Sequence, residues 1–156
     1  MAILAIRKAT EGDVDTIVRL VNAGGPEGKP RTVLPKDLPT EYLEAFRRIA
    51  SDENEWLMVA EVDREIVGTF HMTFITYLHA AGRPDCQVEA IHVAEKHRGK
   101  GFGSQMLKWA IRCAREKRCR RLQLTTDKRR VEAHPFYEKL GFIFSHEGAK
   151  LVLADR

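Results

Sequence analysis

One segment of the sequence has residue types and spacing suited to binding a phosphate group, Arg98-Gly-Lys-Gly-Phe-Gly-Ser104. Three glycines stand at alternate positions, and glycine lets a backbone curl until successive N–H groups point to one side. The residues from Gly103 to Arg118 repeat apolar side chains at helical spacing. The start of a helix adds unpaired N–H groups and the positive end of the helix dipole. We therefore expect backbone amides to hold a diphosphate, helped by the side chains of Arg98 and Lys100.

Two better-known phosphate-binding patterns do not fit this segment. The dinucleotide fingerprint needs Gly-x-Gly-x-x-Gly early in a βαβ unit, and Gly101-Phe-Gly-Ser-Gln-Met106 has methionine at the last position. A Walker A loop needs Gly-Lys-Ser/Thr at a set offset, and that is absent here. The glycines therefore indicate an anion site without naming the anion.

The charge of the chain is unevenly distributed. Residues 96–130 contain thirteen lysines and arginines and two acids, a net charge of +11, whereas the rest of the chain carries a net charge of −7. A concentrated positive field attracts a polyanion. A phosphorylated cofactor, a nucleic acid and a solvated basic helix face without a ligand all agree with this pattern.

Ionisable side chains lie on the predicted strand that precedes the glycine segment. Glu89 stands among Val88, Ala90 and Ile91, and desolvation in such surroundings raises the pKa of a carboxyl group, which suits a general base. A structural ion pair is the alternative role for Glu89. Strand alternation predicts that His92 faces away from Glu89 unless a bulge intervenes.

The remaining candidates for chemistry are histidines and cysteines. His71, on the strand before, could face a substrate pocket, although a plain structural role stays open for it and for His92. The histidine spacing and the absence of a carboxylate cluster give no metal site. The odd number of cysteines and the lack of a Cys-x-x-Cys pair argue against a disulfide framework and a zinc site. We expect free, mostly buried thiols at the three cysteines, Cys86, Cys113 and Cys119.

The elements that position these residues follow from the apolar pattern. Helices are predicted over residues 13–22, from 40 to about 49, over 103–118 and over 131–140; strands are predicted over 2–9, 56–62, 65–78, 86–94 and 121–126, and a closing hairpin over 142–145 and 150–153. The strand–helix–strand unit over 86–126 should be parallel and right-handed. The stretch from Gly24 to Pro39 contains seven glycines and prolines and is predicted to be a long functional loop. The length suits a single mixed α/β domain over residues 1–156.

Two segments together resemble one family. Arg98-x-x-Gly-x-Gly103 is similar to the Arg/Gln-x-x-Gly-x-Gly/Ala acyl-CoA loop of the GNAT superfamily of N-acetyltransferases. Ala133-His-Pro-Phe-Tyr-Glu-Lys-Leu-Gly-Phe142 is similar to its Ala-x-x-Phe-Tyr-x-Lys-x-Gly-Phe segment. The resemblance covers nearly the whole chain. It implies a mostly antiparallel sheet of about six to seven strands with about four helices and a splayed parallel pair at the cofactor site.

The resemblance also implies roles for particular residues. Tyr137 would be the general acid that returns a proton to the leaving thiolate, and Glu89 the base that takes the proton of the amine. Arg130 replaces the family's usual asparagine, and its contact with a phosphate, with an acceptor carboxylate or with solvent stays open. The backbone of the strand would bind the pantetheine arm, and the loop would bind the diphosphate of acetyl-CoA; these cofactor-binding residues are Ile91, His92, Val93, Arg98, Gly99, Lys100, Gly101, Phe102, Gly103 and Ser104.

The predicted function is transfer of an acetyl group from acetyl-CoA to an amine by direct attack in a ternary complex, with no metal. The acceptor is a small-molecule or peptide amine that the sequence does not name. An acyl-CoA sensor without catalysis and a basic nucleic-acid-binding module are the alternatives, and we expect no nucleic-acid partner. No run of eighteen apolar residues exists, so we expect a cytoplasmic protein without a membrane span. The closing hairpin would allow a homodimer.

Overall fold

The computed structural model describes residues 3–153, and the chain divides into two compact units, residues 1–124 and residues 125–156. The first unit holds β1 (Ala5–Lys8), α1 (Val14–Ala23), α2 (Thr40–Ser51), β2 (Glu55–Val62), β3 (Glu65–Thr76), β4 (Pro84–Val93), α3 (Phe102–Glu116) and β5 (Leu122–Gln123). It also holds single-turn 3-10 helices over Glu11–Asp13, Pro26–Gly28, Ala80–Gly82 and Glu95–His97. The second unit holds α4 (Ala133–Glu138). The single domain over residues 1–156 stays a prediction.

The five strands form one sheet in the order β1-β2-β3-β4-β5. The first three neighbouring pairs are antiparallel, and β4 pairs with β5 in parallel. A crossover through α3 joins the two parallel strands, as the predicted strand–helix–strand unit requires. The mixed, mostly antiparallel α/β fold class is therefore confirmed.

The long hairpin of β2 and β3 turns at Asp63 and Arg64, where the sequence lacks the usual glycine. Both residues have positive φ, 50° and 66°. Positive φ at both central residues is the signature of a type I′ turn, whose twist matches that of the flanking strands. Two ordinary residues thus accept a strained conformation so that the hairpin stays tight.

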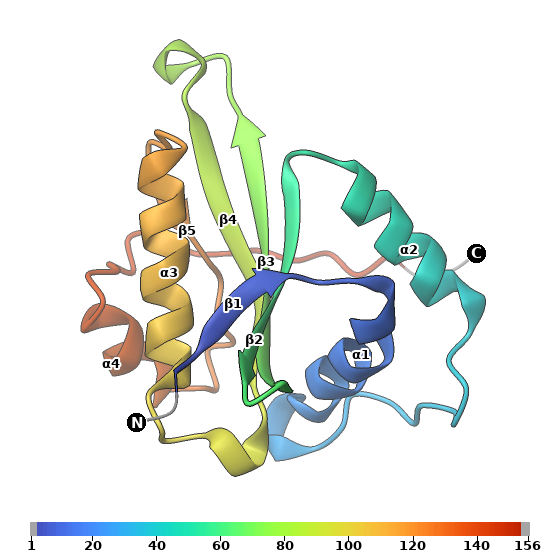
Figure 1. Cartoon of the computed structure of the whole chain (residues 1–156). Helices are drawn as coiled ribbons and strands as arrows, with labels where there is room; N and C mark the ends of the chain where they lie inside the picture. The colour runs from blue at the N-terminus through green and yellow to red at the C-terminus, as the bar shows by residue number, and fades with distance from the viewer. Residues whose placement is uncertain (1–2, 154–156) are drawn as a thin grey trace. The chain divides into compact units, whose positions relative to one another are not determined.

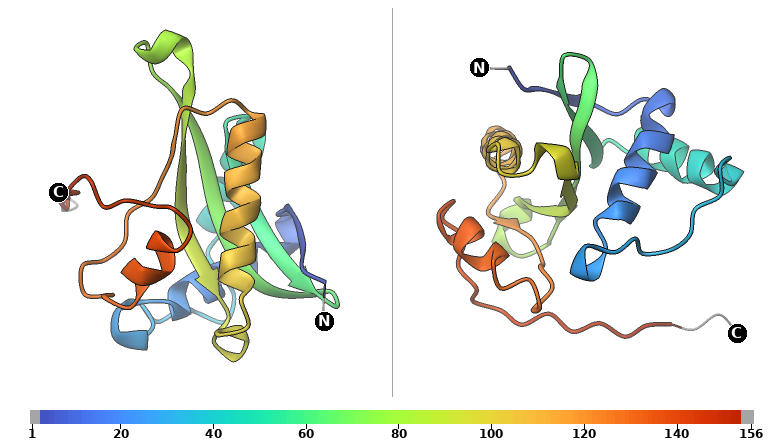
Figure 2. Two further views of the ribbon diagram at one scale, coloured as in Figure 1. Left: turned by 90° about the vertical axis from the view of Figure 1, so that its left-hand side faces the viewer. Right: turned by 90° about the horizontal axis from the view of Figure 1, so that it is seen from below.

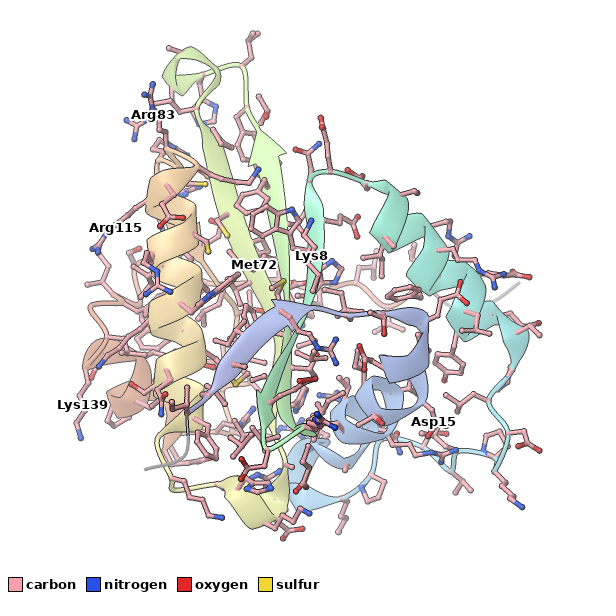
Figure 3. The ribbon with its side chains drawn as sticks, viewed as in Figure 1. Lys8, Asp15, Met72, Arg83, Arg115 and Lys139 are labelled. Atoms are coloured by element: carbon pink, nitrogen blue, oxygen red, sulfur yellow. The ribbon has the colours of Figure 1, made fainter. Side chains whose placement is uncertain are left out.

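The helices cover opposite faces of this sheet, with α3 on one face and α1 and α2 on the other (Figures 1 and 2). On the α3 face, Phe70 of β3 packs edge-on against Trp109 of α3, with ring centroids 5.9 Å apart. A Cβ at Gly68 would lie 2.7 Å from the sulfur of Met106, so glycine is needed for this close approach. Met72, labelled in Figure 3, is fully buried in the middle of β3.

Two predictions about strands are wrong. Within residues 3–153 the sheet has five strands where about six to seven were expected, and residues 142–145 and 150–153 form no strand. The predicted strand over 121–126 is shortened to Leu122–Gln123. The predicted strand over 2–9 is observed as β1, and its first residue lies outside the described residues. A strand exists only where its backbone groups find a partner strand, and alternation of apolar residues does not supply that partner. In the C-terminal segment, Ile143 and Leu151 are accordingly more than 80% exposed.

Candidate active site

The glycine segment connects β4 to α3 through the short helix Glu95–His97 and an extended residue, Arg98. Gly99 and Gly101 have φ of 75° and 81°, in the left-handed region that favours glycine. Gly101 is the N-cap of α3, and Gly103 falls in the first turn of the helix. An ideal Cβ at Gly99 or Gly101 would have no atom within 4 Å. These glycines serve the backbone conformation, and the space beside them is open to a ligand.

The first turn of α3 keeps its N–H groups available. No side chain caps this 15-residue helix. The N–H of Gln105 donates to the carbonyl of Gly101, at 3.1 Å, which leaves the preceding N–H groups of the turn without an intrahelical partner. Such a helix start binds anions through its N–H groups and its dipole. The loop is therefore suited to an anion such as a diphosphate, and its contact with acetyl-CoA stays a prediction.

The side chains of Arg98 and Lys100, the cations of the loop, contact residues close to them in the sequence. The Arg98 guanidinium donates through Nε to the carbonyl of Val93, at 3.3 Å. Lys100 Nζ lies 3.4 Å from Nδ1 of His97. Arg98 thus braces the loop against the end of β4, and its expected contact with a diphosphate stays a prediction.

At the other end of α3, the basic residues have a structural role. Asp85, fully buried at the start of β4, accepts two hydrogen bonds from Arg120, at 3.0 and 2.9 Å, and one from Arg121, at 2.8 Å. These hydrogen bonds, those of Arg120 most of all, hold the pKa of Asp85 below its usual value. Two of the thirteen cations in residues 96–130 therefore neutralise a buried carboxylate.

A bulge in β4 changes which side chains share a face. Ala90 has φ of 49°, and the register shifts there, so that Glu89 pairs with His71 and His92 pairs with Thr69. Residues 69 and 71 of β3 point to the same face, because strand side chains alternate with a period of two. Glu89 and His92 consequently face the same side. The alternation expected without a bulge does not apply here.

That shared face is the one covered by α1. The ring of His92 lies against Gly24 at the C-terminal end of α1, where an added Cβ would stand 2.1 Å from Nδ1. Gly24 therefore has to be glycine for α1 to end on this histidine. Glu89 itself is exposed, contrary to the expected desolvated carboxylate.

Three further polar side chains lie on the same face as Glu89, and sequence reasoning did not place two of them there. His71 Nε2 is 3.2 Å from Oε2 of Glu55 on β2, an ion-pair distance, although the geometry is not that of a hydrogen bond. Gln87 donates from its amide to Glu89, at 3.5 Å. The strand register brings together Glu55, His71 and Glu89, which are 16 to 34 positions apart, and no local pattern in the sequence reports it. Gln87 is two residues before Glu89 on the same strand, and alternation along the strand could have placed it on this face.

The parallel pair is splayed as predicted. β5 pairs with β4 only at Cys86 and Gln87. From Val88 to Val93, β4 has no strand partner on that side among residues 3–153. β4 therefore has no neighbouring strand along Ile91, His92 and Val93 on this side within the described residues, and the binding of a pantetheine arm there stays a prediction.

Tyr137 and Arg130 belong to the second unit. Tyr137, on α4, is 8% exposed and packs edge-on against Phe136 and Phe142, at 5.1 and 5.8 Å between ring centroids. Burial raises the pKa of its phenol, and the charge of Arg130 opposes this rise. Arg130 lies just before α4, with Nε 3.9 Å from a carboxylate oxygen of Glu132.

The cysteines are free, and two of the three are buried. Burial raises the pKa of all three thiols, and that of Cys86 to about 12. Since the thiolate is the nucleophile, these residues are unsuited to carry an acyl group. No three His, Cys, Asp or Glu side chains gather in a metal-binding arrangement within residues 3–153. In the same part of the chain, no helix has the length and apolar character needed to cross a membrane.

Comparison with known proteins defines the class. The chain matches the acetyltransferase (GNAT) family over residues 27–142, and it belongs to this family, whose members use acetyl-CoA. The resemblance deduced from the two motifs is therefore confirmed.

The names of individual relatives describe more specific activities than the family does. The aminoalkylphosphonate N-acetyltransferase of Salmonella typhimurium is 29% identical over 149 residues, covering 94% of this chain and 89% of that protein. The 5-NmdU N-acetyltransferase of Pseudomonas phage PaMx11 is 30% identical over 112 residues, covering 72% of this chain and 73% of that protein. A crystal structure described as a transcriptional regulator from Bacillus halodurans C-125 is 42% identical and covers 97% of this chain and 100% of that chain, with a TM-score of 0.88.

Proposed function

We propose that this enzyme transfers the acetyl group of acetyl-CoA to a primary amine on a small molecule, by direct attack of the amine in a ternary complex. The observation that carries this proposal is the position of Glu89. Its carboxylate is exposed beside the bulge of β4, on the part of the strand that β5 does not pair with. It lies on the face that also carries Glu55, His71, Gln87 and His92, which we call the polar face of the sheet. A base at that point can take a proton from an amine that approaches an acetyl group lying along the strand.

The two proton movements of the reaction have candidate groups. Glu89 accepts the proton that the attacking amine loses, and the amide of Gln87 orients this carboxylate. Tyr137 donates a proton to the sulfur of CoA as the tetrahedral intermediate collapses. Burial keeps the phenol in its protonated form, which is the form that a proton donor needs.

Direct transfer, without an acyl-enzyme, is supported by the cysteines. Their thiols are held in the neutral form by burial, and a neutral thiol is a poor nucleophile. In the proposed reaction the amine of the acceptor attacks the thioester carbonyl itself. The carbon–nitrogen bond forms first and gives a tetrahedral intermediate, and the carbon–sulfur bond breaks when this intermediate collapses, releasing CoA as the thiol.

The relatives supply the first acceptors to test. One relative is named for aminoalkylphosphonates and the other for 5-NmdU. An aminoalkylphosphonate, 5-NmdU and a set of simple primary amines are therefore the first compounds to test, by release of free CoA and by the mass of the product. Peptides with a free N-terminus serve as the comparison.

The catalytic assignment is tested with Glu89→Gln and Tyr137→Phe. Each should lower kcat by about a hundredfold, the usual size of a general acid or base contribution, and leave the calorimetric affinity for acetyl-CoA unchanged. Glu116→Gln, an exposed carboxylate at the end of α3, is the matched control and should keep full turnover. Full turnover in both site variants would refute the assignment, and binding of acetyl-CoA without turnover of any amine would favour a sensor.

One observation favours a second candidate function, binding of nucleic acid by α3. Lys108, Arg112 and Arg115 are exposed at positions that form one stripe of the helix, and Figure 3 shows Arg115 projecting from α3 away from the sheet. The relative from Bacillus halodurans is described as a transcriptional regulator. A gel shift with random duplex and single-stranded DNA distinguishes the candidates. Tight, salt-sensitive binding that CoA does not compete would support the second one.

A further inference from the structure

The connection between α1 and α2, residues 24–39, begins on the polar face of the sheet. Its first residue, Gly24, lies against the ring of His92, which shares a face with Glu89. α1 packs on β3 and β4, the strands that carry this face. The connection is therefore adjacent to the side on which an amine must approach Glu89.

Asn22, in the last turn of α1, holds the connection by its side chain and its backbone. Its amide nitrogen donates to the carbonyl of Thr32, and its amide oxygen accepts from the N–H of Thr32, both at 3.0 Å. The N–H of Arg31 donates to the carbonyl of Asn22, also at 3.0 Å. The side-chain amide thus pairs with both polar groups of one backbone residue, as a neighbouring strand would.

Two arginines extend this attachment. Arg19 binds Asp15 through Nε and donates from Nη2 to the carbonyls of Pro35 and Lys36, at 3.0 and 2.7 Å. Arg31 reaches back to the end of α1, where its guanidinium lies 3.4 Å from the carbonyl of Val21. A segment rich in glycine and proline is thus tied to one helix near its middle and near its end.

We propose that Asn22 is a specificity-determining positioning residue, which fixes the 24–39 connection as a preformed wall of the acceptor site. This inference rests on the proposed function, because the wall selects an amine only if the enzyme acetylates one. A preformed wall spares the acceptor the entropy cost of ordering the loop, and it admits only molecules that match its fixed shape. Loss of the Asn22 amide should weaken acceptor binding while the glycine loop at the start of α3 keeps its affinity for acetyl-CoA.

The kinetic test uses Asn22→Ala and the acceptor found in the amine screen. Two hydrogen bonds of ordinary net strength correspond to about a tenfold change, so the KM for the acceptor should rise about tenfold. The KM for acetyl-CoA should stay within about twofold of the wild-type value, since no contact at the glycine loop is altered. Asn54→Ala, at the only other asparagine in the chain, is the matched control and should leave both constants unchanged. An unchanged acceptor KM in Asn22→Ala, or an equal rise in both KM values, would overturn the inference.

Amide hydrogen exchange at Thr32 supplies a readout independent of activity. The Thr32 amide should be protected in the free enzyme and lose this protection in Asn22→Ala. Asn22→Asp keeps the acceptor oxygen but replaces the donor by a carboxylate that faces the Thr32 carbonyl, so the amide should stay partly protected while the acceptor KM still rises. This second variant also serves if Asn22→Ala fails to fold.

The failures of the two proposals look different. If the wild-type enzyme acetylates no amine, the proposed function fails and the inference about specificity fails with it, whatever the exchange data show. If the wild-type enzyme is active but Thr32 exchanges as fast as an unprotected amide, the proposed function stands and the preformed wall is refuted.

Discussion

Basic residues lie near both ends of α3, but their roles differ: those beyond the C-terminal end stabilise the fold, and those at the N-terminal end lie beside a loop suited to a ligand. Just beyond the C-terminal end, in the link to β5, Arg120 and Arg121 donate hydrogen bonds to the buried carboxylate of Asp85. At the N-terminal end, two glycines with positive φ leave open space and backbone N–H groups, while Arg98 braces the loop. The net charge of +11 over residues 96–130 therefore does not describe one binding site. The backbone, more than the number of cations, distinguishes the end suited to a ligand from the end that stabilises the fold.

The largest expected effect is on stability, at the C-terminal end. Asp85→Ala removes three charge-assisted hydrogen bonds from a buried site, and we expect the free energy of unfolding to fall by about 2–3 kcal/mol, because both arginines can turn toward water. Urea unfolding measures this loss. Calorimetry at low temperature should find the affinity for acetyl-CoA unchanged. A large loss of affinity would contradict the conclusion that the Asp85 site stabilises the fold without binding the ligand.

The next effect is on the ligand, at the N-terminal end. In Gly101→Ala the side chain meets no atom but the left-handed backbone is strained by about 1–2 kcal/mol, so the loop should relax and the affinity for acetyl-CoA should fall about tenfold. Gly82→Ala is the matched control, because Gly82 has φ of 72° and equally open surroundings in a turn far along the chain. Equal loss of affinity in both variants would show that strain alone, and not the loop, lowers binding.

The interaction of Asp85 with the two arginines beyond the C-terminal end of α3 should also make the stability of the protein depend on pH. The pKa of Asp85 is lowered in the folded protein, so its contribution to stability is fully present above the pKa of an unfolded aspartate, about 3.9, and is lost as the pH falls through the folded value. Unfolding by urea between pH 5 and pH 2 should therefore be less pH-dependent in Asp85→Asn than in the wild-type protein. The same slope in both proteins would mean that Asp85 is not held by the arginines.

The smallest effect is expected for the exposed cations. Lys100→Gln should weaken acetyl-CoA binding about two- to fivefold in calorimetry at low salt, and less at high salt, as for other solvent-exposed charge pairs. Arg115→Gln, near the far end of the same helix, should leave affinity unchanged. A larger effect of Arg115→Gln than of Lys100→Gln would indicate that acetyl-CoA binds nearer to the C-terminal end of α3.

The sequence predicted those parts of the fold and site that depend on neighbouring residues. The glycine loop, the helix after it and the Phe136–Tyr137 segment are short-range patterns, and the fold class and family followed from them. The bulge at Ala90 was not foreseen, because a non-glycine residue with positive φ has no reliable signature. The contacts of His71 with Glu55 and of Arg120 with Asp85 depend on strand register and on the crossover, which join distant residues. The closing hairpin failed for the same reason, since alternation shows which residues could pair but not whether a partner strand is present.

The central claim is that the N-terminal end of α3 holds the diphosphate of acetyl-CoA. The most direct measurement follows the backbone amide resonances of the protein during titration with CoA and, separately, with pantetheine, which lacks the diphosphate. The account predicts that the amides of Gly99, Gly101 and Gly103 shift with CoA and not with pantetheine, while those of Arg120 and Arg121 stay in place. Glycine amides that do not respond to saturating CoA, or that respond equally to pantetheine, would contradict it.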